Sequence, residues 1–427
     1  MKLKLAYNHD GLEVNLPGGL NHAVYHTKPV PLPAAPETII AKAMATPVGA
    51  PRLSDLAKGR RDACIVISDV TRPVPNALIL PPIARALEEA GMRRDDILIL
   101  VGTGIHRPNL GDELRRVVGD FIMDNYRVEN HYSQRAEDQV FVGSTTRGIP
   151  LYINRRYIDA SLKIVTGLIE PHMWAGFSGG RKGILPGISS VETMKFMHGY
   201  DMIADPGLGY GRLKGNPFHE AGIEVTKIAG CDFLVNVTID GQRRLTGAYC
   251  GNIVDAHLAG CEALRPYVEH EFREPVDCVL CSGGGLPLDH VFYQSTKAMV
   301  VADAILKPGG SMIVACGCSE GAGSPEFARL LDKVESVDQF MALLRQPGFF
   351  EVDQWCAQQI YEIRRRHEIF YYTTGLDKDR LKRYLMTPIA SVEEGVERCL
   401  KKHGPAARFA IFPEGPYVYG RIAAARE

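Results

Sequence analysis

The residues best suited to acid–base, nucleophilic or metal chemistry gather in one stretch, from Gly167 to His198. It reads GLIEPHMWAGFSGGRKGILPGISSVETMKFMH. Its centre, GFSGGRKG, offers consecutive backbone N–H groups and two cations, Arg181 and Lys182, which suits a phosphate group. A neighbouring cation lowers the pKa of a lysine and glycines leave it accessible, so Lys182 is a candidate nucleophile. A flexible turn with solvated charges is the plainer interpretation and remains open.

Two familiar nucleotide motifs are absent from the glycine loops. A Walker A motif needs glycine where Arg181 stands and Ser or Thr where Gly183 stands. Gly102-x-Gly104 lacks the third glycine of a dinucleotide fingerprint, because Arg107 occupies that place. Neither ATP binding by a Walker loop nor a Rossmann dinucleotide site is therefore favoured.

Three of the 13 histidines stand at positions where a functional side chain would be expected. His106 and His172 each follow an apolar run, and two imidazoles can serve as acid and base near neutral pH. His198 follows a helix start at Ser189-Ser190 and is a candidate metal ligand. Taken alone, each histidine is more often structural or exposed than functional.

The apolar runs before these residues predict the strands that position them. Helical stretches lie between most of the runs, so the pattern predicts α/β architecture with mainly parallel sheets flanked by helices, and ligands at the carboxyl ends of the strands. A Pro-rich segment, residues 29–51, is expected to be an irregular connection. The predicted strands are Ala63–Ser68, Asp96–Gly104, Leu162–Thr166, Phe233–Ile239, Cys278–Cys281, Met312–Ala315 and Phe409–Phe412.

Length and composition restrict the domain organisation and the partners. The 427 residues suit two domains, with residues 1–270 as an N-terminal cofactor-attachment and catalytic domain. Residues 271–427 then form a C-terminal α/β domain that closes the active site in an interdomain cleft, with a last helix that could pack back on the first domain. A net charge of −1 indicates no nucleic-acid partner. With neither a signal peptide nor an 18-residue apolar run, and with only ten cysteines, we expect a cytoplasmic protein without membrane attachment.

Five motifs in order resemble the lactate racemase family, which uses a nickel-pincer nucleotide. The longest is the block from Pro171-His172 through Gly-Phe-Ser-Gly-Gly-Arg-Lys-Gly-Ile-Leu-Pro-Gly. A further segment, Trp355-Cys356 to Gln358, is also similar. The other matched motifs are Ser68-Asp69-Val70-Thr71-Arg72-Pro73, Gly102-Thr103-Gly104-x-His106-Arg107, His198 and Tyr293-Gln294-x-x-Lys297.

This resemblance implies a role for each matched residue. Lys182 would be joined through a thioamide to the cofactor, a nickel complex of pyridinium-3-thioamide-5-thiocarboxylic acid mononucleotide. His198 would complete the nickel coordination, a role that imidazole suits. His106 and His172 would be the two catalytic bases. Substrate binding is implied for Arg72, Lys297 and Gln294, and cofactor binding for Ser178, Gly179, Gly180, Asp69, Tyr293 and Trp355.

The implied reaction is racemisation or epimerisation of a small 2-hydroxy acid, lactate being one candidate. One histidine removes the hydroxyl proton while the C2 hydride moves to the cofactor, and its return to the opposite face of the 2-oxo acid inverts the centre. The resemblance also implies cofactor-biosynthesis and nickel-insertion proteins as partners, and a homo-oligomer is compatible with it. Two alternatives remain open: a nucleotide-dependent oxidoreductase or kinase that uses the glycine loop, and a non-catalytic carrier of nickel or cofactor.

Overall fold

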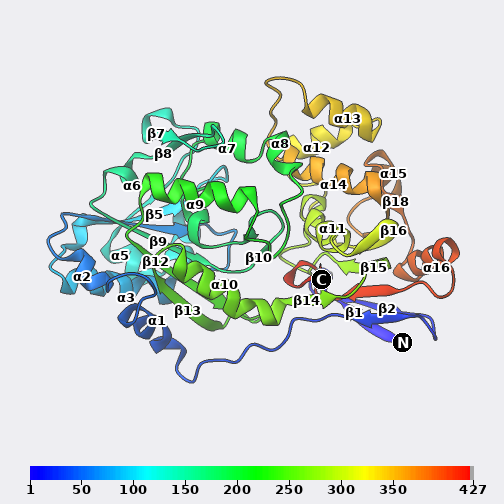
Figure 1. Cartoon of the computed structure of the whole chain (residues 1–427), viewed down its shortest axis with the longest axis horizontal. Coiled ribbons are helices and arrows are strands. Elements are labelled where there is room, and N and C mark those ends of the chain that lie inside the picture. The colour runs from blue at the N-terminus through cyan, green and yellow to red at the C-terminus, as the bar shows by residue number, and fades with distance from the viewer. Residues whose placement is uncertain (424–427) are drawn as a thin grey trace. The chain divides into compact units, whose positions relative to one another are not determined.

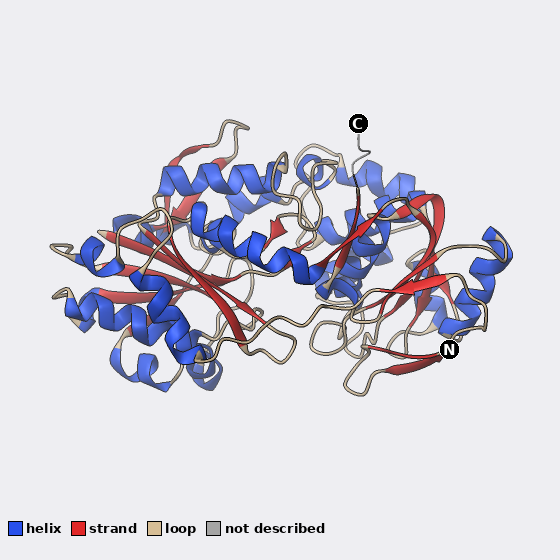
Figure 2. Ribbon diagram, turned by 60° about the horizontal axis from the view of Figure 1, so that its bottom comes forward, coloured by secondary structure: helices blue, strands red, loops and turns tan. Residues whose placement is uncertain are grey.

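A computed structural model of the chain, described here over residues 1–423, has the predicted α/β architecture (Figures 1 and 2). The chain forms two compact units. One comprises residues 29–197 and 212–265 and is called the Lys182 unit. The other comprises residues 1–28 and 198–211 and the chain from residue 266 onward, and is called the Lys297 unit. Each unit has its own six-stranded sheet with helices packed against it.

The sheet of the Lys182 unit has the order β13-β12-β9-β4-β5-β6, and only β12 and β13 are antiparallel. Its central strands are continuous apolar runs because both of their faces are covered. Ile65, Ile99 and Ile164 are fully buried in this core. The strands are β4 (Ala63–Ser68), β5 (Ile97–Gly102), β6 (Arg127–Asn130), β9 (Leu162–Leu168), β12 (Phe233–Ile239) and β13 (Leu245–Gly251).

Helices and two small hairpins complete the Lys182 unit. The hairpins are β7 (Gln139–Ser144) with β8 (Pro150–Asn154), and β10 (Pro171–His172) with β11 (Gly176–Phe177). The helices are α1 (Pro36–Ala45), α2 (Leu53–Ala57), α3 (Asn76–Glu89), α4 (Gly111–Val118), α5 (Asp120–Asn125), α6 (Arg155–Asp159), α7 (Val191–Met197), α9 (Pro217–Ala229) and α10 (Asp255–Val268), of which the last three residues lie beyond the unit.

The expectation of an irregular connection over residues 29–51 is wrong for its middle part, which forms α1. The prolines on either side suggested a loop and obscured a helical spacing. Ile40 and Met44 stand four residues apart, lie on one face and are both buried in the core of the unit.

The sheet of the Lys297 unit is parallel throughout, in the order β18-β17-β16-β15-β19-β3. Its strands are β3 (His22–Val24), β15 (Val276–Ser282), β16 (Leu306–Ala315), β17 (Glu368–Tyr372), β18 (Thr387–Pro388) and β19 (Phe409–Phe412). Two further strand pairs are β1 (Lys2–Leu5) with β2 (Leu12–Asn15) and β14 (Glu269–Phe272) with β20 (Tyr419–Ile422). The helices are α8 (Tyr200–Ile203), α11 (Thr296–Asp303), α12 (Pro325–Asp332), α13 (Val337–Leu344), α14 (Gln354–Arg366), α15 (Lys378–Arg383) and α16 (Val392–His403).

The two units are not the two continuous halves that one boundary near residue 270 describes. Strand β3 pairs with β19, and Leu5 and Val14 are buried in the same core as Ile313 and Ile411. The first 28 residues therefore belong to the Lys297 unit. The last helix, α16, packs on β16 and β17 of its own unit. No helix within residues 1–423 is long and apolar enough to cross a bilayer.

Candidate active site

The carboxyl ends of three adjacent strands carry most of the predicted catalytic residues. Strand β4 lies between β9 and β5 and is parallel to both. Asp69 and Arg72 follow β4, His106 follows β5, and His172 follows β9. Parallel neighbours end at the same edge of a sheet, so the fold brings together residues that are far apart in the sequence.

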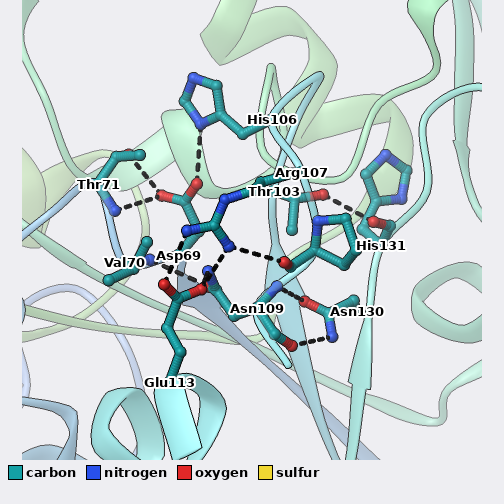
Figure 3. A network of polar contacts seen from close by, with 11 residues as sticks. Asp69, Val70, Thr71, Thr103, His106, Arg107, Asn109, Glu113, Asn130 and His131 are labelled. Atoms are coloured by element: carbon teal, nitrogen blue, oxygen red, sulfur yellow. Dashed lines mark hydrogen bonds and ion pairs between the residues drawn. The ribbon is translucent and has the colours of Figure 1, made fainter. Parts of the chain in front are cut away.

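Asp69 and His106 form a hydrogen-bonded carboxylate–imidazole pair (Figure 3). Nδ1 of His106 lies 2.8 Å from Oδ2 of Asp69, while the hydroxyl of Thr71 donates to Oδ1 at 2.6 Å. Burial by itself would raise the pKa of Asp69, but the hydrogen bonds and charge of His106 and the Thr71 hydroxyl bring it below the usual value. The carboxylate fixes the proton of His106 on Nδ1, which leaves Nε2 as the basic atom, on a side chain that is 54% exposed.

Arg107, next to His106, is engaged elsewhere. Its guanidinium makes two parallel bonds to Glu113, at 2.6 and 2.8 Å, in the geometry typical of a carboxylate clamp (Figure 3). Asn109 donates a third bond to the same carboxylate at 2.8 Å. The hydrogen bond from Arg107 lowers the pKa of Glu113 to about 2, with a second contribution from Asn109. Arg107 therefore shapes the loop that carries His106.

Arg72 has a looser acidic neighbour. Its Nε lies 3.5 Å from Oε1 of Glu170, and both side chains are about one-third exposed. At that distance the pair orients the guanidinium while leaving donors for another anion. Glu170 is itself positioned by the chain, because its backbone N–H donates to the hydroxyl of Ser178 at 3.2 Å.

His172 and Lys182 are in direct contact. Nε2 of His172 lies 3.0 Å from Nζ of Lys182. Nδ1 of the same ring accepts the backbone N–H groups of Trp174 and Ala175, both at 3.2 Å, so the neutral imidazole carries its proton on Nε2. Such an N–H can be accepted by the uncharged amine of Lys182, which is the nucleophilic form of lysine.

The glycines before Lys182 are required by close packing in this structure. Gly179 and Gly180 have φ values of +77° and +53°, and a Cβ on either would come within 2.7 Å of Asn236 or His257. The N–H of Gly180 donates to Oδ1 of Asn236 at 2.8 Å, and the hydroxyl of Ser178 donates to the carbonyl of Leu168 at 2.9 Å. Their role in holding a nucleotide phosphate stays a prediction.

The sequence patterns did not point to His131, which connects the loop after β5, at Thr103, with the segment at Ser189. Thr103 donates to its carbonyl at 2.7 Å, and its ring Nε2 lies 3.0 Å from the carbonyl oxygen of Ser189. Nδ1 accepts from the amide of Asn154 at 3.0 Å. Burial lowers the pKa of His131 to about 4, so the ring is neutral. The available signal was its position after β6, a strand too short and polar to be recognised in the sequence.

In the Lys297 unit, three predicted cofactor or metal residues form one cluster. The rings of His198 and Trp355 have centroids 4.8 Å apart. The indole N–H of Trp355 donates to the hydroxyl of Tyr293 at 3.0 Å. His198 is 6% exposed, and burial raises the pKa of Tyr293 well above its usual value. This unit therefore holds a buried imidazole against an aromatic wall.

Lys297 and Gln294 lie one turn apart, where the short helix η4 (Phe292–Ser295) leads into α11. Both are partly buried. The Oε1 atom of Gln294 is buried and accepts no hydrogen bond from any described residue. Among residues 1–423, no group of three or more His, Cys, Asp or Glu side chains is placed to hold a metal ion.

The predicted site residues thus fall into two sets, one in each unit. The Lys182 unit groups Asp69 with His106, Arg72 with Glu170, and His172 with Lys182. The Lys297 unit groups His198, Trp355 and Tyr293, with Gln294 beside Tyr293 on η4 and Lys297 in the first turn of α11.

Two family models match the chain. Residues 7–211 match the lactate racemase N-terminal domain and residues 272–419 match the lactate racemase C-terminal domain. The lactate racemase of Thermoanaerobacterium thermosaccharolyticum is 33% identical over 387 residues, 90% of each chain. The lactate racemase of Lactiplantibacillus plantarum is 32% identical over 397 residues, 92% of each chain.

Solved structures show the same fold. The lactate racemase apoprotein of Thermoanaerobacterium thermosaccharolyticum matches with a TM-score of 0.92 and 32% identity, over 99% of this chain and all of that one. A protein of Thermotoga maritima matches with a TM-score of 0.64 at 17% identity, over 92% of this chain and all of that one, which is a likeness of fold alone.

Proposed function

The chain belongs to the lactate racemase family, and from that premise we propose that it interconverts the enantiomers of lactate or of a closely related small 2-hydroxy acid. It is an isomerase, like the relatives that it matches over nine-tenths of their length. The observation that carries the proposal is the Asp69–His106 pair, which presents an oriented base after β5, while a second imidazole, His172, follows β9 on the other side of β4.

His106 is the better placed of the two to act first as a base. Its Nδ1–H donates to Asp69, so the lone pair of Nε2 is available for the hydroxyl proton of the substrate. The ring then becomes positively charged, and the adjacent carboxylate stabilises that charge. Asp69 is therefore proposed to position His106, which adds to the cofactor contact implied by the resemblance.

His172 is proposed as the second acid–base group. Two backbone N–H groups hold its Nδ1, so proton exchange at this ring takes place at Nε2, the atom facing Lys182. A racemase needs a proton donor and acceptor for each enantiomer, which two histidines in different surroundings provide.

The substrate carboxylate is proposed to bind Arg72, with Lys297 and Gln294 completing the recognition. Charge-assisted bonds from a guanidinium are among the strongest available to a small carboxylate. Glu170 restrains Arg72 without neutralising all of its donors.

The described residues fit a nickel-pincer nucleotide attached to Lys182. No three-ligand metal cluster is present among residues 1–423, so a nickel ion held by the cofactor and one imidazole, His198, agrees with the available donors. Nζ of Lys182 lies 3.0 Å from Nε2 of His172, whose N–H can donate a hydrogen bond to the amine. When bound, the nucleotide would supply the centre that takes and returns the C2 hydride. Ser178, Gly179, Gly180, Tyr293 and Trp355 are proposed to line it.

The proposal also implies protein partners that supply the cofactor, and a cytoplasmic location. A covalent nickel nucleotide requires proteins that synthesise the cofactor and insert the metal. All ten cysteines are free in the structure, which suits a reducing compartment such as the cytoplasm.

Co-expression with cofactor-synthesis proteins, followed by intact-mass measurement, nickel analysis and chiral chromatography of lactate, tests the proposal. A mass adduct, one nickel per chain and conversion of either enantiomer to a racemate are expected. Lys182→Ala should lose both adduct and activity, whereas His106→Ala should keep the adduct and lose about 10²- to 10⁴-fold in rate. Lys227→Ala, an exposed lysine on α9, is the matched control.

The alternatives give different results in the same experiment. An unmodified chain that racemises lactate would exclude the cofactor. Loading without interconversion would identify a carrier, and net oxidation to the 2-oxo acid would identify an oxidoreductase.

A further inference from the structure

A buried guanidinium lies next to Lys182 without a carboxylate partner. Arg181 is 3% exposed, and its Nη2 donates to the carbonyl oxygens of Ala175 and Phe177, at 2.6 and 3.0 Å. Its Nη1 lies 3.0 Å from Nε2 of His257. No described Asp or Glu pairs with Arg181, although buried charges in proteins are ordinarily paired.

The groups around Arg181 do not supply the missing negative charge. Burial lowers the pKa of Arg181 to about 10, so it remains positive at neutral pH. Burial and the nearby Arg181 charge lower the pKa of His219 to about 3, and that of His257 well below its usual value, so both rings are neutral. Burial raises the pKa of Cys261 to about 12, which keeps this neighbour a thiol. The cluster therefore carries one uncompensated positive charge.

A hollow adjoins this cluster. It leaves about 10 Å³ for the centre of a water-sized sphere, and Arg181, His219 and His257 line it. Two buried nitrogens of the lining, Nε of Arg181 and Nδ1 of His219, make no hydrogen bond to any described residue. The remaining lining residues are Ile223, Thr226, Ile253 and Val254.

We propose that this hollow binds a small monovalent inorganic anion of the size of chloride. Such an ion would accept hydrogen bonds from Nε of Arg181 and Nδ1 of His219 and would neutralise the guanidinium. Ile223, Ile253 and Val254 give it an apolar wall, which a weakly hydrated monovalent ion tolerates. A sulfate or phosphate would need more donors than the hollow offers, because burying a second charge without partners is costly. A water molecule could bridge both nitrogens but would leave the charge uncompensated.

The anion would link three elements of the Lys182 unit. Arg181 lies in the 3-10 turn η3 (Gly180–Gly183), which also carries Lys182, while His219 and His257 lie on α9 and α10. Occupancy should therefore stabilise the turn that holds Lys182. This inference stands apart from the proposed racemisation, since no step of it uses the hollow.

The direct test uses wild-type protein with bromide in place of chloride. Anomalous diffraction should show one bromide within hydrogen-bond distance of Nε of Arg181 and Nδ1 of His219. In solution, sodium chloride should raise the midpoint of thermal unfolding by about 3 °C or more over sodium gluconate at equal ionic strength. Density for water alone, or equal midpoints in the two salts, overturns the proposal.

A variant tests whether the chloride-dependent shift in the unfolding midpoint arises at the hollow. His219→Phe removes one donor and fills the space, so the chloride-dependent shift should disappear. His9→Gln, an exposed histidine in the Lys297 unit, should keep the whole shift. A shift that survives in His219→Phe contradicts the assignment, and if that variant does not fold, the bromide experiment on the wild type decides.

Discussion

Asp69 and His106 come from the ends of adjacent strands, and their Oδ2 and Nδ1 atoms lie 2.8 Å apart. Asp69 is 4% exposed and the imidazole of His106 is more than half exposed, so a buried carboxylate orients a base that a substrate can reach. This arrangement resembles the way in which a carboxylate selects the tautomer of a catalytic histidine in hydrolases, and it leads to the first prediction.

Asp69→Asn should lower kcat by about 10²- to 10⁴-fold, because the amide no longer selects the Nδ1–H tautomer or stabilises a charged ring. Chiral chromatography of lactate measures the rate. Glu113→Gln is the matched control, since it removes the partner of Arg107 and leaves the Asp69–His106 bond in place. Wild-type kcat in Asp69→Asn would show that the pair does not serve catalysis.

Arg72→Met should lower kcat/KM by about 10- to 150-fold, the loss expected for a hydrogen bond between charged groups. Arg72→Lys should recover part of that loss, because the charge returns without the two-pronged geometry. Arg107→Met, in the loop after β5, tests whether loss of another cation near the carboxyl ends of these strands has the same effect. Its guanidinium is already paired with Glu113, so KM should stay close to that of the wild type.

Acid should destabilise the Lys182 unit through His131. Its pKa is about 4 in the folded protein, below the usual 6.5, because burial disfavours the charged ring. The unfolded chain therefore binds the proton more readily. The stability associated with the neutral ring is fully present above pH 6.5 and is lost as the pH falls toward 4. The free energy of unfolding lost through His131 amounts to about 2 kcal/mol at pH 5.

Urea unfolding at pH 7 and pH 5 measures this loss of stability. His131→Gln should reduce the difference between the two pH values by about 2 kcal/mol, while His9→Gln, on the surface, should leave the difference unchanged. An unchanged difference in His131→Gln would assign the acid sensitivity to other groups, of which His219 and His257 are the first to examine.

Gly180→Ala should destabilise the turn that carries Lys182 by about 1–3 kcal/mol. The residue has a φ of +53°, and an added Cβ would lie 2.7 Å from Cγ of His257. Gly241→Ala is the control, because its Cβ would meet nothing within 4 Å and its φ is not in the left-handed region. Urea unfolding compares the two variants, and equal stabilities would show that the Gly180 turn relaxes without strain.

Local sequence patterns were enough to predict the α/β class and the central strands. Apolar runs such as Ala63–Ser68 and Phe233–Ile239 coincide with β4 and β12. A strand buried on both faces must be apolar at every position, and that requirement is visible in a short window. The same reasoning failed for α1, where prolines outweighed a short helical spacing, and for β6, which is short and polar.

What the sequence determined by itself was the inventory of reactive side chains and the ends of the strands that carry them. Only the tertiary structure decided their partners: Asp69 for His106, Asn236 for the Gly180 amide, and the buried His257 beside Arg181. These pairs join segments 37 to 76 residues apart. Strand order and register bring such segments together, and they depend on packing across the whole sheet, which no local pattern of residues encodes.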